Sequence, residues 1–426
     1  MASFAPSLFV FFFHLINNWP KFAVYIFNLS TSSPLEELIE IKWDRPGKLK
    51  PNGRSSIFAN SATDFRKYYG LVYLSACSSL LRTWQNRTVQ SLEWTISDQY
   101  NQQHFYWNTQ ECQTSWLAPK QSSYIVKVSV KFLDRKILRG KTRITIRDYW
   151  IGVIGDSFAS GEGNPDVPAN ARDKTMAKWL SNRCHRSSRS WSYKVYKQVT
   201  SAIVERSAAV HFSYLPCSGA SVDNGILVVL NSTSQITVLE QITSIRGTGP
   251  DLLMMSVGGN DIGYSEILST LIWGPTGSLF STVDMRFFYA SHQLDRVAKA
   301  IQKLKPNQVV IPHYFDLTRN ERGIVDADCA DMRQISTENL ILAEKKILQR
   351  INGLITKKSK QYGWTAVEGV AELFRSRGYC SSTSFIRSIR DSIRLQGNSF
   401  GAFHPIEEAH QQIADLVVKQ VQQFGN

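Results

Sequence analysis

The sequence lacks the cysteine spacings of metal-binding and redox proteins. Its six cysteines are spread through 426 residues, and no two of them form a C-x-x-C pair. Zinc-binding and thioredoxin-like proteins are therefore disfavoured. No other metal-ligand spacing is present, so we predict neither a metal ion nor a cofactor. An even number of scattered cysteines fits either disulfides or buried thiols.

Long apolar runs are also missing. The segment Leu8–Ile16 has the length of a signal-peptide hydrophobic region, but no Lys or Arg precedes it and no clear cleavage site follows it. Polar residues and a proline interrupt its extension to Phe27, which disfavours a membrane-spanning helix. We interpret residues 1–30 as an imperfect signal sequence, with a buried strand or a tail as the alternative. N-glycosylation sequons occur at Asn28, Asn86 and Asn231. We expect a secreted protein whose contact with membranes is at most peripheral.

Acidic residues are outnumbered, and the formal net charge is +14. Between Lys120 and Arg147, Asp134 is the single acid. The bases of this segment are Lys120, Lys127, Lys131, Arg135, Lys136, Arg139, Lys141, Arg143 and Arg147. Positive charge favours anionic partners, although it can also serve solubility alone. No nucleic-acid motif accompanies it. We therefore predict no nucleic-acid partner and leave open a peripheral anionic surface; the oligomeric state is not determined.

Residues 85–148 carry the period-two pattern of β-strands. Apolar and polar residues alternate in Tyr124–Phe132 and in Arg143–Arg147, and the charged residues around Gly140 predict a turn between them. Further strand candidates are Val89–Ile96 and Gln103–Trp107. We predict a small antiparallel β-sandwich of immunoglobulin-like class, whose basic residues lie on the solvated strand faces. Residues 31–84 are left unassigned.

From residue 149 the texture changes to α/β. Short apolar runs occur at Trp150–Gly155, Ala208–Tyr214, Leu252–Val257 and Val309–Pro312. Helical stretches lie between or after them, for example at Leu294–Leu304, Thr337–Ile355 and Ile406–Phe424. Strands that alternate with helices favour a parallel sheet covered on both faces. We predict a three-layer α/β/α domain over residues 149–426.

A serine motif directly follows the first of these apolar runs. The segment Gly155–Gly163 reads GDSFASGEG and places Ser157 on a glycine-punctuated turn. A serine at the carboxyl end of a parallel strand lies at the crevice where open α/β sheets bind ligands. If a helix begins there, its free N–H groups face a developing oxyanion. A helix-capping turn serine is the alternative for an isolated motif of this kind.

Further motifs make this one part of a set. Cys217–Ser221 (CSGAS) and Gly258–Asp261 (GGND) each follow another apolar run, and Gly401–Pro405 (GAFHP) lies near the C-terminus. In this order the motifs resemble the blocks of the SGNH/GDSL hydrolase family, which includes lipases, phospholipases, esterases and carbohydrate deacetylases. The resemblance covers roughly residues 150–425.

The resemblance implies roles for single residues. Ser157 would be the nucleophile and His404 its base, because serine needs an adjacent base to attack. The Ser157 N–H, the Gly219 N–H and the Asn260 amide would form the oxyanion hole. Asp156 and Asp261 are expected to support these loops by capping or hydrogen bonding. His185, His211, His313 and His410 are the other candidates for the base, and we favour His404 because Pro405 starts a helix after it.

One position departs from the family pattern. The family has an acid three residues before the histidine, and this chain has Gly401 there. A triad acid holds the imidazole and stabilises its charged form. A backbone carbonyl or an acid from elsewhere must replace it, or the enzyme uses a Ser–His dyad. The change also raises the alternative of an inactive homologue.

The cysteines near the motifs suggest pairings. A Cys184–Cys217 disulfide would tie the segment after the nucleophile to the oxyanion loop. We also predict Cys329–Cys380, and Cys77–Cys112 follows by elimination. The motifs together predict a secreted serine esterase or lipase that uses an acyl-serine intermediate, with lipid esters favoured. The alternatives are a carbohydrate O-deacetylase and an inactive homologue that binds glycan or membrane.

Overall fold

The computed structural model describes residues 39–422 apart from 51–52, 55–56, 80–86, 101, 171, 206, 230–231, 274–276, 330 and 334. The segment 1–30 and the three sequon asparagines lie outside the described residues. Within the described part, no helix is long and apolar enough to cross a membrane.

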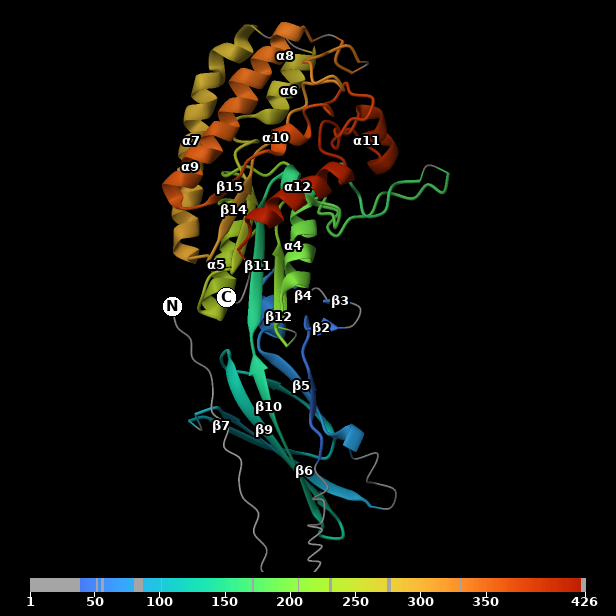
Figure 1. The fold of residues 1–426 in the computed structure, drawn as a ribbon, viewed down its shortest axis with the longest axis vertical. Helices are drawn as coiled ribbons and strands as arrows, with labels where there is room; N and C mark the ends of the chain where they lie inside the picture. The colour runs from blue at the N-terminus through green and yellow to red at the C-terminus, as the bar shows by residue number, and fades with distance from the viewer. Residues whose placement is uncertain are drawn as a thin grey trace, which may run out of the picture. The chain divides into compact units, whose positions relative to one another are not determined.

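Two antiparallel sheets are built from the N-terminal part of the chain (Figure 1). The four-stranded sheet has the order β10-β9-β6-β7 and the three-stranded sheet the order β1-β5-β8. Their strands are β1 (Lys42–Asp44), β5 (Leu71–Ser75), β6 (Val89–Asp98), β7 (His104–Thr109), β8 (Gln113–Leu117), β9 (Ser122–Phe132) and β10 (Ile137–Ile146). A short ladder joins β2 (Leu49–Lys50) to β3 (Gly53–Arg54). The four expected strands are confirmed. The strand β8 was not expected, and β1, β2, β3 and β5 come from the segment left unassigned.

Alternation along these strands builds a shared core. Trp94 of β6 and Val128 of β9 point inward from one sheet, and Val72 of β5 and Trp116 of β8 belong to the same buried cluster. One face of each sheet is therefore apolar and covered, as the period-two pattern requires. The immunoglobulin-like assignment stays a prediction.

The turn expected at Gly140 is wrong. Gly140 lies inside β10, opposite Val128, and the turn occupies residues 133–136. A Cβ at Gly140 would lie 2.2 Å from the carbonyl oxygen of Ile39, whose backbone N–H donates to Arg139 O at 2.9 Å. Glycine is needed here for the close approach of another backbone segment and not for a turn.

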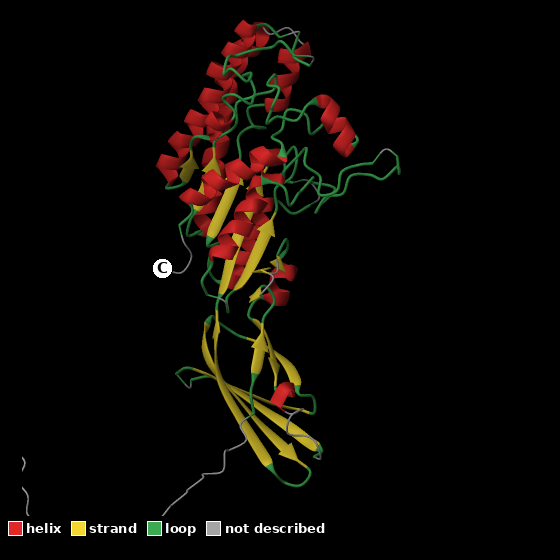
Figure 2. Ribbon diagram, turned by 45° about the vertical axis from the view of Figure 1, so that its right-hand side comes forward, coloured by secondary structure: helices red, strands yellow, loops and turns green. Residues whose placement is uncertain are grey.

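A six-stranded parallel sheet forms the centre of the remaining chain, in the order β15-β14-β13-β11-β12-β4. Its strands are β4 (Ile57–Phe58), β11 (Asp148–Gly155), β12 (Ala209–Tyr214), β13 (Leu252–Ser256), β14 (Val309–Pro312) and β15 (Thr365–Val367). The strands β11 to β14 confirm the four apolar runs seen in the sequence. In contrast to the antiparallel sheets, this sheet is covered by helices (Figure 2).

Helices cover both faces of the parallel sheet. They are α1 (Ala62–Tyr68), α3 (Ser157–Ser160), α4 (Trp191–Ala202), α5 (Gln235–Arg246), α6 (Tyr264–Trp273), α7 (Gly277–Leu304), α8 (Thr337–Ala343), the π-helix η1 (Glu344–Leu348), α9 (Gln349–Tyr362), α10 (Val370–Leu373), α11 (Ile389–Gln396) and α12 (Glu407–Gln420). α4 packs against α12, while α5 packs against α1 and α7, and α7 against α9. The chain passes from β11 through α4 to β12 on one side, then through α5 to β13 on the other. Because such crossovers are right-handed, α4 and α5 cover opposite faces.

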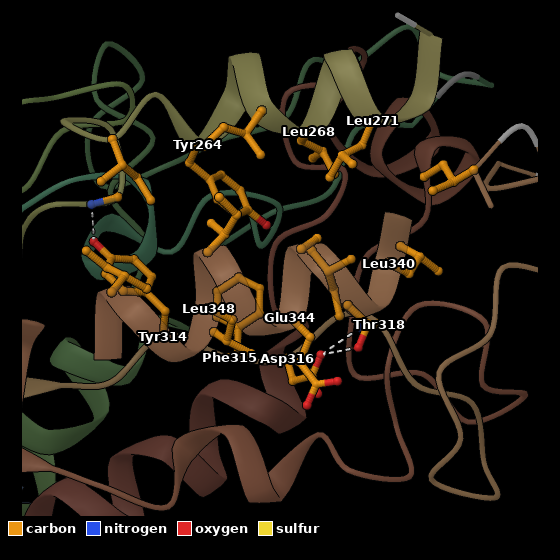
Figure 3. A pocket seen from close by; sticks show the side chains of 18 of the residues that line it. Tyr264, Leu268, Leu271, Tyr314, Phe315, Asp316, Thr318, Leu340, Glu344 and Leu348 are labelled. Atoms are coloured by element: carbon orange, nitrogen blue, oxygen red, sulfur yellow. Dashed lines mark hydrogen bonds between the residues drawn. The ribbon is translucent and has the colours of Figure 1, made fainter. Parts of the chain in front are cut away.

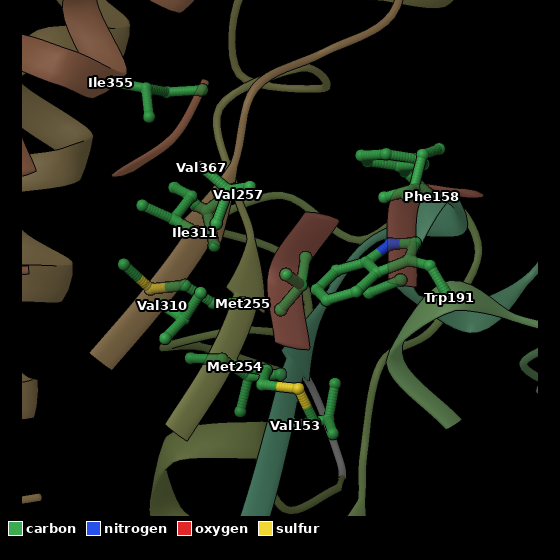
Figure 4. Packing of buried hydrophobic residues seen from close by; sticks show 14 of the residues in the cluster. Val153, Phe158, Trp191, Met254, Met255, Val257, Val310, Ile311, Ile355 and Val367 are labelled. Carbon is green, nitrogen blue, oxygen red and sulfur yellow. The ribbon is translucent and has the colours of Figure 1, made fainter. Parts of the chain in front are cut away.

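β11 is therefore the strand at which the sheet order reverses. Ligands of open α/β sheets bind at this switch point, beyond the carboxyl ends of the strands. The strands of this sheet pack in a buried apolar core that includes Val153, Met254 and Val310. Trp191 and Phe158 belong to the same core (Figure 4). The end of β11 is thus a rigid support for the residues that follow it.

A buried polar cluster anchors the opposite end of β11. Asp148 accepts hydrogen bonds from Arg45 Nη2 at 2.7 and 2.8 Å and lies 2.8 Å from His211 Nε2. Burial alone would raise the pKa of Asp148, but the hydrogen bond from His211 and the charge of Arg45 lower it overall. Arg45, which directly follows β1 of the three-stranded sheet, is thereby tied to the start of β11.

Candidate active site

Ser157 begins the short helix α3 at the end of β11. The side chain of Asp156 caps this helix by accepting from Phe158 N at 3.0 Å. Ser157 Oγ lies 2.8 Å from His404 Nε2, although the two residues are 247 positions apart. The structure therefore brings together the serine and the histidine expected from the sequence, within the reach that proton transfer requires.

The loop around His404 fixes the direction of the imidazole. Its Nδ1 lies 3.0 Å from the carbonyl oxygen of Ala402. Arg387 N donates to His404 O at 2.8 Å, and Phe403 N donates to Arg387 O at 2.9 Å. Phe403 has a φ of 62°, a left-handed conformation that is uncommon for a bulky residue. With Nδ1–H donated to a backbone carbonyl, Nε2 is the basic nitrogen that faces Ser157.

Gly401 has no room for the missing acid. A Cβ at this position would lie 2.5 Å from Gly163 Cα, 2.8 Å from Gln396 Oε1 and 3.0 Å from Ser392 Oγ. Contacts below 3 Å with a backbone atom force the chain to move. The loop is therefore built on a direct contact between two glycine backbones, and the hydrogen-bond partner of His404 Nδ1 is the Ala402 carbonyl.

The expected oxyanion groups come from loops that adjoin the Ser157 turn. The loop of Gly219 is attached to the end of β11, because Cys217 N donates to Gly155 O at 3.0 Å. Gly219 has a φ of 81° and open space where a Cβ would stand. Asn260 donates one amide hydrogen to Ala220 O at 2.9 Å, and a primary amide has a second. The Ser157 N–H is among the helix-terminal donors that have no partner within their own helix.

Asp156 holds the nucleophile turn against a second loop. It accepts hydrogen bonds from Ser256 Oγ at 2.5 Å and from Tyr314 Oη at 3.0 Å. Tyr314 Oη also accepts from Gly259 N at 2.9 Å. Burial raises the pKa of Asp156. Sequence reasoning missed Tyr314, which lies after β14 in a segment without any motif.

Asp261 supports the oxyanion loops. Its Oδ1 accepts from Val222 N at 3.0 Å and so joins the GGND loop to the segment after Gly219. Burial, with the nearby charge of Asp156 as a smaller cause, raises the pKa of Asp261 to about 6. Both aspartates are therefore hydrogen-bonded to groups of neighbouring segments.

A buried carboxylate close to the site was also missed. Glu162 is 1% exposed and lies 2.8 Å from His185 Nδ1, while Gln396 Nε2 donates to it at 2.9 Å. Burial alone would raise the pKa of Glu162, but the hydrogen bond from His185 and the charge of His404 help to lower it to about 2. The only signal in the sequence is the acid within the GEG turn of the first motif.

The other histidines are engaged elsewhere. His410 accepts from Trp191 N at 3.1 Å, and burial lowers its pKa to about 3. His313 Nε2 lies 2.9 Å from Thr356 Oγ1, and His211 pairs with Asp148 at the far end of β11. His404 is the candidate base that contacts Ser157.

The predicted disulfides are present. Cys184–Cys217 joins the segment after the nucleophile to the oxyanion loop, and Cys329–Cys380 and Cys77–Cys112 are also formed. Ser218 N donates to Cys184 O at 3.1 Å beside the first of them. The loop of Gly219 is thereby attached both to the segment of Cys184 and to the end of β11.

An apolar pocket lies next to the GGND loop (Figure 3). Gly259 and Tyr314 line one part of it, and Leu268 and Leu271 of α6 face the helix of α8, η1 and α9 across it. The other apolar lining residues are Ile262, Ile267, Phe315, Leu317, Met332, Ile335, Leu340, Ala343, Ile347, Leu348 and Ile351. Its lining is suited to a hydrocarbon ligand.

No protein-family model matches the chain. Among solved structures, the extracellular lipase of Streptomyces rimosus aligns with a TM-score of 0.45 and 20% identity, over 64% of this chain and 98% of the lipase. Phospholipase A1 of Streptomyces albidoflavus aligns with a TM-score of 0.44 and 18% identity, over 64% of this chain and 98% of that protein.

Two curated proteins are similar in sequence. Lipase 1 of Streptomyces coelicolor is 23% identical over 248 residues, or 55% of this chain and 75% of that relative. A lipase of Streptomyces rimosus is 25% identical over 263 residues, or 58% of this chain and 78% of that relative. These similarities support an ester hydrolase. They also support the resemblance of this chain to the SGNH/GDSL family.

Proposed function

We propose that this chain is a secreted serine esterase that hydrolyses lipid esters through an acyl-serine intermediate. The 2.8 Å contact between Ser157 Oγ and His404 Nε2 at the switch point of the sheet carries the proposal. Ser157 attacks the ester carbonyl while His404 takes its proton. His404 then protonates the leaving alcohol, and it activates the water that releases the acid.

The negative oxygen of the tetrahedral intermediate needs donors that are already in place. Ser157 N–H, Gly219 N–H and the second amide hydrogen of Asn260 are the proposed donors. Removal of one such donor typically costs about 10²–10³ in kcat. Cys217 N donates to Gly155 O, and Asn260 Nδ2 donates to Ala220 O. These hydrogen bonds support this role, because they hold both loops beside the nucleophile turn.

His404 works without a hydrogen-bonded acid in this proposal. Its Nδ1–H donates to Ala402 O at 3.0 Å, which selects the tautomer with a basic Nε2. A carbonyl dipole orients the ring as a triad acid does, but it brings no full negative charge to stabilise the imidazolium.

The apolar pocket favours a lipid over an acetylated glycan. An acetyl group has no chain to fill it, whereas each methylene placed in an apolar site contributes about 0.8 kcal/mol. Because Gly259 lines the pocket and precedes Asn260, we propose that the acyl chain enters here.

Secretion and contact with an anionic lipid surface belong to the same proposal. The three disulfides favour an oxidising compartment. On the exposed face of the four-stranded sheet, Lys141 of β10 lies opposite Lys127 of β9, and Arg139 and Arg143 are also exposed. Like charges in opposite cross-strand positions are unfavourable on their own, and an anionic surface would offset this.

A panel of p-nitrophenyl esters from acetate to decanoate tests the function. We expect kcat/KM to rise with acyl length and all hydrolysis to be lost in Ser157→Ala. Hydrolysis of the acetate alone would favour the deacetylase. A folded wild-type protein that cleaves none of the esters would favour the inactive binding homologue.

A further inference from the structure

Glu162 is a buried acid that the proposed mechanism does not yet use. A carboxylate that is 1% exposed is costly unless it is paired and hydrogen-bonded. Three segments meet this need, because His185 and Gln396 contact the carboxylate at 2.8 and 2.9 Å and Ser218 forms a further hydrogen bond. The chain therefore keeps an ionised acid in the interior, one turn beyond the nucleophile.

The backbone around Glu162 is attached both to Ser157 and to the His404 loop. Glu162 N donates to Ser157 O at 3.1 Å. Its neighbour Gly163 makes the close backbone contact with Gly401, and Asn164 Nδ2 donates to Pro405 O at 2.9 Å. The GEG turn thus fills the place next to the histidine where an acid at position 401 would stand.

The other titratable groups near His404 do not supply the same charge. Asp156 is engaged by the hydroxyls of Ser256 and Tyr314, and burial raises its pKa. His410 on α12 has a pKa lowered to about 3 by burial and is neutral. On the α4 side, Lys194 and Arg189 are both paired with Glu407.

One cation also acts on this region. The guanidinium of Arg387 donates to Asn164 Oδ1 at 2.8 Å. A positive charge therefore lies beside Asn164, two residues after Glu162. His185, which faces Glu162, is a hydrogen-bond donor to it in either protonation state, because its Nδ1 is directed at the carboxylate.

We propose that Glu162 is a positioning residue that replaces the charge of the missing triad acid. From the nucleophile turn it stabilises the His404 imidazolium through space, while Ala402 O orients the ring. The inference rests on the proposed serine esterase function. The two tasks of a triad acid, orientation and charge, are then divided between the Ala402 carbonyl and the Glu162 carboxylate.

The test compares wild type with Glu162→Gln, which keeps the shape and removes the charge. A negative charge nearby favours the protonated ring. We therefore expect the acidic limb of the kcat/KM profile, and the NMR titration midpoint of the His404 ring, to move to lower pH by about one unit, with kcat about tenfold lower. Glu162→Asp should give a smaller change in the same direction, and it serves as the second variant should Glu162→Gln not fold.

His185→Gln is the matched control, since it removes a hydrogen bond from Glu162 but leaves the charge. It should lower thermal stability without moving the acidic limb downward. A Glu162→Gln protein that is less stable but keeps the wild-type ring titration would overturn the inference. If wild type hydrolyses no ester, the proposed function fails, while the ring titration still decides whether Glu162 acts on His404.

Discussion

Restoring the family's acid at position 401 should damage this enzyme. A side chain at Gly401 starts with its Cβ 2.5 Å from Gly163 Cα. Carbon atoms in contact are about 3.5–4.0 Å apart, so the two loops must separate by about 1 Å. Such overpacking costs about 1–3 kcal/mol of stability. A displacement of about 1 Å at His404 lowers kcat about 100-fold.

Gly401→Ala and Gly401→Asp are therefore expected to show similar losses, although the aspartate returns the triad acid. The assays are urea unfolding at pH 7 and kcat on a butyrate ester, normalised to the active sites counted by a covalent inhibitor. Gly353→Ala is the control, because Gly353 lies in α9 with nothing within 4 Å of an added Cβ. A Gly401→Asp protein as stable as wild type and at least as active would refute the packing argument.

Three further predictions concern the pocket, the buried acid and the basic sheet face. Leu268→Trp should fill the pocket and exclude about four methylenes, which costs about 3 kcal/mol or roughly 100-fold in the ratio of decanoate to acetate kcat/KM; an unchanged ratio would mean that the acyl chain binds elsewhere. Folding lowers the pKa of Glu162 from 4.5 to about 2, so its contribution to stability is complete above pH 4.5 and is lost as the pH falls toward 2. Glu162→Gln should accordingly remove about 3 kcal/mol of the difference in unfolding free energy between pH 7 and pH 2, measured by urea titration. The double variant Lys127→Gln, Lys141→Gln should weaken binding to phosphatidylglycerol vesicles at low salt but not at 1 M salt, where charges are screened beyond about 3 Å; equal binding by both proteins would remove this face from the account.

Much of the candidate site was predictable because three of the four motifs follow a strand. The apolar runs before Ser157, Gly219 and Asn260 are visible in the sequence, and parallel strands place their carboxyl ends at one edge of a sheet. Their pairing with His404 was supplied by the resemblance and not by periodicity. The alternation of β6 and β9 was equally visible, because one face of each strand is buried.

The features that were missed depend on contacts between distant segments. Glu162 meets His185 and Gln396 only in the folded chain, and no local pattern distinguishes it from a solvated turn acid. Tyr314 lies in a loop without regular structure and acts through its hydroxyl. Gly140 was assigned to a turn because glycine is common in turns, whereas the close passage of Ile39 is what requires it.

Covalent labelling of the purified protein with a fluorophosphonate probe tests the central claim most directly. The account predicts that the probe attaches to Ser157, as located by peptide mass spectrometry, and that labelling is lost in Ser157→Ala and strongly slowed in His404→Ala. Labelling of another residue, or equal labelling of folded wild type and Ser157→Ala, would contradict it.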